Sequence, residues 1–159
     1  MQRLEKVLKL RANNLLRDSN QLMMNIQHDF PEDAIVNYQT AWSFDVIGLE
    51  NEAIPYYEKA IKLGLDNQNE PNAYLGLGST LRTIGEYQKS EKVFQEGITK
   101  YPEFKALQVF YAMTLFNLKK HEDSIRQLLD VVITSTKDES IKDYERAIHF
   151  YKDKLHLVW

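Results

Sequence analysis

The chain has 159 residues, no cysteine and a formal net charge of −3, from 20 basic and 23 acidic residues. The lack of cysteine excludes disulfide bonds, thiolate metal sites and a cysteine nucleophile. The two signs of charge are interleaved, without the basic stripe that is typical of nucleic-acid-binding proteins. No apolar run approaches the roughly 20 residues of a membrane span. We therefore expect one cytoplasmic, soluble domain that binds neither nucleic acid nor membrane.

Residues of similar type recur at fixed offsets along the chain. Gly48 follows Asn14 by 34 residues, Gly85 follows Gly48 by 37, and Lys119 follows Gly85 by 34. The same offsets link three further sets of residues: Ala41, Gly78 and Ala112; Ser19, Ala53, Ser90 and Ser124; and Met23, Tyr57, Phe94 and Leu128. Such self-similarity is typical of a repeat protein.

Each repeat is predicted to be two antiparallel helices joined by a tight turn. Gly48 and Gly85 lie where the backbone leaves the first helix, often with positive φ. Asn14 tolerates that conformation and Lys119 does so poorly. The small residues mark the close approach of the paired helices, and the rings of Tyr57 and Phe94 fill the space between neighbouring repeats.

This pattern resembles the tetratricopeptide repeat family, in particular its small stand-alone bacterial members. The matching residues, in order, are Tyr74, Leu77, Gly78, Leu81, Ser90, Phe94 and Pro102. The resemblance implies an all-α fold, a right-handed α-α superhelix whose concave face is lined by the first helix of each repeat. It also implies a protein-binding role.

The repeats are expected within one domain, 1–159, at about 1–33 (degenerate), 34–67, 71–104 and 105–137. A capping helix is expected at about 140–155, because apolar residues recur there at spacings of three and four. These residues are Ile141, Tyr144, Ile148, Tyr151 and Leu155. The opposite side of this helix is charged, as the end of a repeat array requires.

No arrangement of residues predicts catalysis. The histidines are His28, His121, His149 and His156, and none has a histidine partner at the spacing of a helical metal site. No glycine-rich phosphate loop follows a strand. We expect no catalytic, metal-binding or cofactor-binding residue, and no enzyme.

The first helices carry an unusually apolar row of residues on the side turned away from their partners. The row comprises Leu4, Leu8, Tyr38, Trp42, Leu75, Ser79, Arg82, Val109, Met113 and Phe116. Aromatic residues, methionine and arginine are enriched in binding sites. We predict a concave groove that binds a peptide or an apolar helix, oriented by Arg82. In the alternatives, these residues cover one another, a chain end covers them, or they form a homodimer interface.

Overall fold

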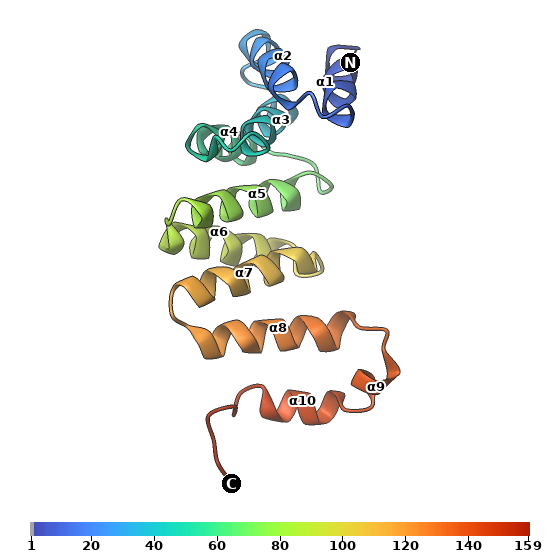
Figure 1. Cartoon of the computed structure of the whole chain (residues 1–159), viewed down its shortest axis with the longest axis vertical. Helices are drawn as coiled ribbons and strands as arrows, with labels where there is room; N and C mark the ends of the chain where they lie inside the picture. The colour runs from blue at the N-terminus through green and yellow to red at the C-terminus, as the bar shows by residue number, and fades with distance from the viewer. Residues whose placement is uncertain (1) are drawn as a thin grey trace. The chain divides into compact units, whose positions relative to one another are not determined.

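The computed structural model describes residues 2–159, and Met1 lies outside the described residues. This range contains ten helices and no strand, which confirms the all-α fold. The helices are α1 Gln2–Ala12, α2 Leu16–Asp29, α3 Ala34–Asp45, α4 Glu50–Leu63, α5 Glu70–Thr83, α6 Tyr87–Lys100, α7 Lys105–Asn117, α8 His121–Ser135, α9 Glu139–Lys142 and α10 Glu145–Tyr151 (Figure 1). Within 2–159, no helix combines the length and apolar content that crossing a bilayer requires.

The contacts divide the chain into two compact units, Met1–Glu86 and Tyr87–Trp159. The first unit contains α1 to α5 and the second contains α6 to α10. The boundary follows α5, so it passes through the third predicted repeat.

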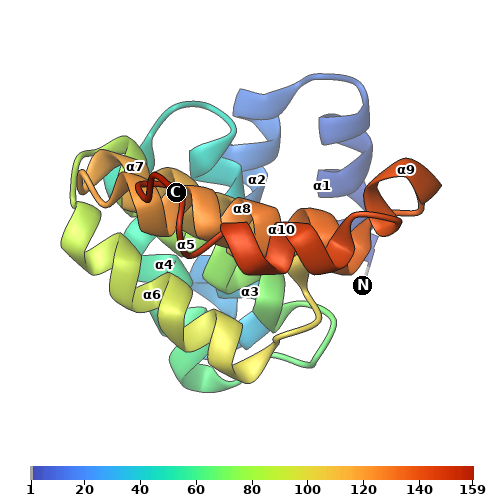
Figure 2. The same cartoon turned by 90° about the horizontal axis from the view of Figure 1, so that it is seen from below.

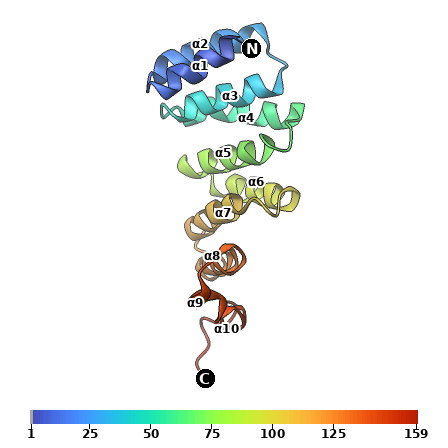
Figure 3. The same ribbon diagram turned by 90° about the vertical axis from the view of Figure 1, so that its right-hand side faces the viewer.

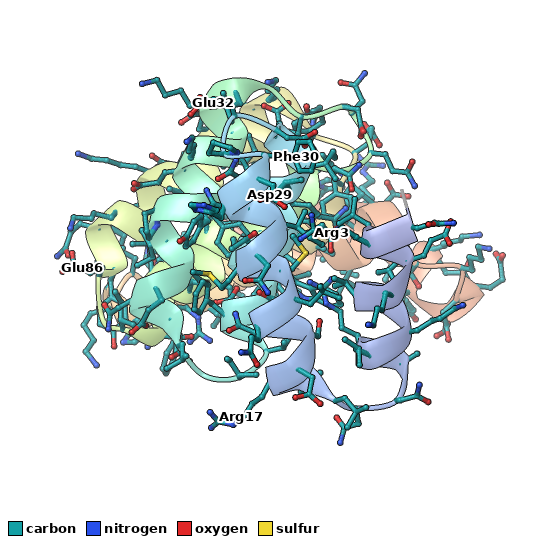
Figure 4. The ribbon with its side chains drawn as sticks, turned by 90° about the horizontal axis from the view of Figure 1, so that it is seen from above. Arg3, Arg17, Asp29, Phe30, Glu32 and Glu86 are labelled. Atoms are coloured by element: carbon teal, nitrogen blue, oxygen red, sulfur yellow. The ribbon has the colours of Figure 1, made fainter. Side chains whose placement is uncertain are left out.

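The first unit is built from helical hairpins, with α1 beside α2 and α3 beside α4 (Figure 3). Val7 of α1, Met23 and Ile26 of α2 and Val36 of α3 form a buried apolar cluster. At the open end of the first hairpin, Arg3 on α1 forms an ion pair with Asp29 at the end of α2, at 2.5 Å (Figure 4). This ion pair is exposed, so it contributes little to stability. The buried apolar cluster is the main stabilising contact of the hairpin.

The turns between paired helices have the backbone that the repeat pattern predicts. Asn14, Gly48, Gly85 and Lys119 all have positive φ, at 58°, 74°, 85° and 63°. Lys119 therefore adopts the left-handed conformation, which is unfavourable by roughly 1–2 kcal/mol for a residue that has a Cβ. The prediction of four equivalent turns is confirmed, including the turn with the unfavourable residue.

The large ring at the repeat-interface position is buried in both units. Tyr57 of α4 is 1% exposed, and α5 packs over its ring. Phe94 of α6 is 0% exposed, and its ring lies 6.4 Å from that of Tyr111 on α7. In both cases the first helix of the following repeat covers the ring, as the offsets predict.

The expected helix at 140–155 is divided into α9 and α10, and neither contains a buried residue. The break lies at Tyr144, whose amide donates to the Ile141 carbonyl, three residues back, in place of the four-residue α-helical bond. Ile141 and Ile148 are half-buried, whereas Tyr144, Tyr151 and Leu155 are exposed. The apolar stripe is therefore only partly used for packing.

Ion pairs hold the C-terminal segment against α8. Lys152 contacts Asp130 at 3.1 Å, and Arg126 contacts Asp153 at 2.6 Å. Helix α10 lies beside α8 in the second unit (Figure 2). Charged residues just past the end of α10 therefore contact α8, while Ile148 of α10 itself is half-buried.

Candidate functional site

The inner helices of the first unit, α1, α3 and α5, carry seven of the ten residues predicted to bind a partner. Leu8 and Trp42 are exposed, and Tyr38, Leu75, Ser79 and Arg82 are half-buried. Side-chain hydrogen bonds connect α1 to α3 and α3 to α5. The three helices therefore form one connected layer, which we call the first inner surface.

Trp42 is held in place by Arg11, a residue that the sequence did not point to. The Arg11 guanidinium carbon lies 4.1 Å from the centroid of the Trp42 ring, within the range of a cation–π contact. The same guanidinium donates to the Gln39 carbonyl at 2.9 Å and to the Ser19 hydroxyl at 3.2 Å. One face of the indole is thus fixed by Arg11, while 39% of the Trp42 surface stays open to solvent.

The charge on Arg11 persists at neutral pH although the side chain is largely enclosed. Burial lowers the pKa of Arg11 to about 10, and the nearby Tyr38 and Tyr57 act in the opposite direction. Arg11 therefore remains a cation near pH 7. Its contact with Trp42 is a permanent feature of the first inner surface, not one that titrates in the physiological range.

Leu4 lies elsewhere than predicted. It is half-buried and packs against the apolar cluster of Val7, Met23, Ile26 and Val36. Leu4 is three residues before the fully buried Val7, so both side chains lie on the face of α1 that meets α2. Leu4 is therefore a packing residue, and Leu8, one residue past Val7, is the exposed leucine of α1.

Behind the first inner surface, Asp45 connects α3, α4 and α5. The Tyr57 hydroxyl donates to Asp45 Oδ2 at 2.6 Å, and the Thr80 hydroxyl donates to Asp45 Oδ1 at 2.8 Å. Burial raises the pKa of Asp45, whereas the hydrogen bonds from Tyr57 and Thr80 lower it. The net direction is upward, so the fold favours the protonated acid more than water does. The Tyr38 ring lies 6.3 Å from that of Tyr57.

Replacing Tyr57 with phenylalanine should raise the pKa of Asp45 further, because one of the two hydroxyl donors to the carboxylate is lost. A group with a raised folded-state pKa contributes stability below its unfolded pKa, and this contribution is lost as the pH rises through the folded value. The Asp45 contribution should therefore disappear at higher pH in Tyr57→Phe than in the parent. Carboxyl chemical shifts measured by NMR against pH test this, with Asp66, an exposed carboxylate, as the unaffected reference. An unchanged Asp45 pKa would contradict the role of Tyr57.

The second unit carries the other three predicted residues on α7. Val109 is half-buried, and Met113 and Phe116 are exposed. The Phe116 ring lies 4.8 Å from the His121 ring at the start of α8. These three residues lie at spacings of four and three, so they share one side of α7. We call this the second inner surface.

A repeated buried hydroxyl position was missed in the sequence. Ser43, Thr80 and Thr114 are separated by the same offsets, 37 and 34, as the other repeat positions. Ser43 accepts a hydrogen bond from Asn20 at 3.0 Å, and Thr114 lies 2.9 Å from Ser90. The offset was the available signal.

A second missed position is a buried amide near the start of the inner helices. Asn37 Nδ2 donates to the Pro31 carbonyl at 2.8 Å, and Gln108 Nε2 donates to the Pro102 carbonyl at 3.0 Å. Pro31 and Pro102 occupy equivalent repeat positions, as do Asn37 and Gln108. Each amide therefore fixes the turn that precedes its helix.

Comparison with known families finds a match over most of the chain. The family described as "Tetratrico peptide repeat" matches residues 34–155. Among curated proteins, the chain is 25% identical over 108 residues to Superkiller protein 3 of Saccharomyces cerevisiae. That alignment covers 64% of this chain but only 7% of the yeast protein.

Solved structures with low sequence identity share the fold. The MamA protein superposes with a TM-score of 0.73 at 16% identity, covering 99% of this chain and 76% of MamA. YrrB, whose structure is described as a TPR protein with an unusual peptide-binding site, superposes with a TM-score of 0.70 at 16% identity. That match covers 96% of this chain and 77% of YrrB. At these identities the likeness concerns the fold alone.

Proposed function

Since the chain belongs to the tetratricopeptide repeat family, a family of protein-interaction modules, we propose that it binds a peptide or a short apolar helix. The first inner surface is the proposed site. Its exposed residues are Leu8 and Trp42, and the half-buried Arg82 gives the same layer a cation. An apolar segment with an acidic or carbonyl group near one end fits this composition best.

The observation that carries the proposal is the fixed and exposed ring of Trp42. A tryptophan held in one orientation loses little conformational entropy when a partner covers it. The stack on Arg11 supplies that orientation, and the open part of the ring supplies contact area. Rigid aromatic residues of this kind are typical anchors of protein interfaces.

The test begins with capture of a partner by the full chain and its identification by mass spectrometry. Binding of the identified segment is then measured by calorimetry. Trp42→Ala should weaken binding by roughly 2 kcal/mol or more, which is about a 30-fold rise in Kd. Phe30→Ala is the matched control, because Phe30 is another exposed aromatic ring, located on the α2–α3 turn. It should bind as the parent does.

The circular dichroism spectrum and urea midpoint of each variant are part of this test. Trp42→Ala removes the stacking partner of Arg11, so a stability loss of about 1 kcal/mol is expected. A Trp42→Ala chain that stays folded and binds as the parent does would place the site elsewhere. A chain that no longer folds would identify Trp42 as a core residue.

The second inner surface is proposed as a further contact region, with Met113 at its centre. Met113→Glu would place a charge in a desolvated contact and should weaken partner binding. The alternative is that these apolar residues form a homodimer interface. Light scattering of the parent and of Met113→Glu separates the two, since a dimer that this variant loses indicates a homodimer interface, whereas loss of partner binding at an unchanged mass does not.

A further inference from the structure

The repeat-interface position is covered in the second and third repeats and open in the fourth. Tyr57 and Phe94 are 1% and 0% exposed, whereas Leu128 of α8 is 39% exposed. These three residues occupy equivalent positions, and α5 and α7 cover the first two. The segment that follows α8 therefore leaves open a position that the earlier repeats close.

The ion pairs between α8 and the residues that follow α10 lie on another side of α8 than this open position. Lys152 contacts Asp130, Arg126 contacts Asp153, and His156 lies 3.3 Å from Glu122. On α8, Glu122, Arg126 and Asp130 recur every four residues and mark the side that faces α10. Ile125, Leu128 and Val132 lie on a different side of α8 and are all exposed.

Exposed apolar residues are also concentrated on the segment after α8. Tyr144 is 67% exposed, and Phe150, Tyr151 and Leu155 are each about half exposed. We call these four residues and the three of α8 the terminal apolar surface: Ile125, Leu128, Val132, Tyr144, Phe150, Tyr151 and Leu155. A fully exposed aromatic side chain offers about 150–250 Å², so the exposed fractions amount to roughly 600 Å² on each chain.

We propose that the terminal apolar surface is covered by the same surface of a second copy of this chain. Two such surfaces would bury roughly 1,200 Å² in total, at the lower end of the range for specific interfaces. Arg126 and Lys152 form ion pairs with Asp153 and Asp130 within the chain, so these charges do not oppose the approach of two copies. An apolar patch can meet the same patch of a second copy, as a two-fold interface requires.

Sedimentation equilibrium of the full chain tests the proposal. The parent should form a dimer with a Kd below about 100 µM. Leu128→Glu combined with Val132→Glu should raise that Kd at least about tenfold, because each carboxylate would be buried without a partner. Tyr151→Ser removes an exposed ring, so this variant should fold normally and should also raise the dimer Kd. Leu15→Glu is the control, since Leu15 is exposed in the first unit.

Cross-linking gives an independent measurement, because the chain has no cysteine of its own. Single substitutions Ile125→Cys, Val132→Cys, Tyr144→Cys and Tyr151→Cys are treated with a bismaleimide. A two-fold interface requires at least one of them to form linked dimers, while Phe30→Cys in the first unit does not.

Three results would overturn the proposal. The first is a parent chain that remains monomeric up to about 200 µM, well above the expected Kd. The second is a dimer that Trp42→Ala or Met113→Glu abolishes and the terminal variants do not. The third is a mass that keeps growing beyond two copies, since an open head-to-tail contact gives that result and a two-fold contact does not.

Discussion

Phe94→Ala should lower the free energy of unfolding by about 4 kcal/mol, because burial of this ring is complete. Phe94 is 0% exposed and packs beside the Tyr111 ring. The loss has two parts, the transfer of the ring out of water and the cavity left between α6 and α7. Folded domains are stable by only about 5–15 kcal/mol, so a change of this size should shift urea denaturation strongly.

Leu128→Ala is the matched control for this prediction, at the equivalent repeat position. Leu128 is 39% exposed, so its truncation removes less buried surface and opens no enclosed cavity. We expect a loss below about 1.5 kcal/mol, measured at a protein concentration where the chain is monomeric. Equal losses for the two variants would show that the last repeat is closed as tightly as the one before it.

The repeat positions were predictable because one physical requirement recurs at each of them. A chain that leaves a helix through a left-handed residue favours glycine, and the offsets of 34 and 37 placed Gly48, Gly85 and their equivalents correctly. A second recurring requirement is close packing of the helices. It buries the small residues Ala41 and Ala112 and the ring of Phe94. Periodicity reveals contacts that every repeat makes.

Contacts that only one repeat makes could not be predicted in this way. The Arg11 stack on Trp42 depends on the lateral approach of α1 to α3, which no spacing along the chain encodes. Asp45 and Arg82 occupy equivalent positions in neighbouring repeats. The difference between the two residues does not indicate that Asp45 accepts hydrogen bonds from Tyr57 and Thr80.

Two parts of the chain depart from the predicted pattern, Leu4 and the segment after α8. Leu4 packs onto the buried cluster with α2. The segment after α8 has spacings that suit one long helix, but its backbone turns at Tyr144, and Lys152, just past α10, pairs with Asp130 of α8. Periodicity identifies an apolar stripe without identifying what covers it.

Gly76→Ala should destabilise the protein by about 3 kcal/mol, although the same change within an ordinary helix stabilises by up to about 1 kcal/mol. A Cβ on Gly76 would lie 2.5 Å from Cζ of the Tyr57 ring, closer than any relaxed contact. The ring is buried and cannot move outward freely. Its displacement would also break the 2.6 Å hydrogen bond to Asp45, which is charge-assisted when Asp45 is ionised.

A double-mutant cycle with Tyr57→Leu decides whether this contact is the cause. Leucine is shorter than tyrosine and leaves room beside residue 76, so Gly76→Ala should cost little or even stabilise in that background. The coupling between the two substitutions should then be about 3 kcal/mol, read from urea denaturation of the four proteins. A cost of Gly76→Ala that persists without the Tyr57 ring would mean that α5 requires glycine for its own backbone. A cost that disappears would show that Gly76 is required at this position because a buried tyrosine on the preceding helix occupies the space of its side chain.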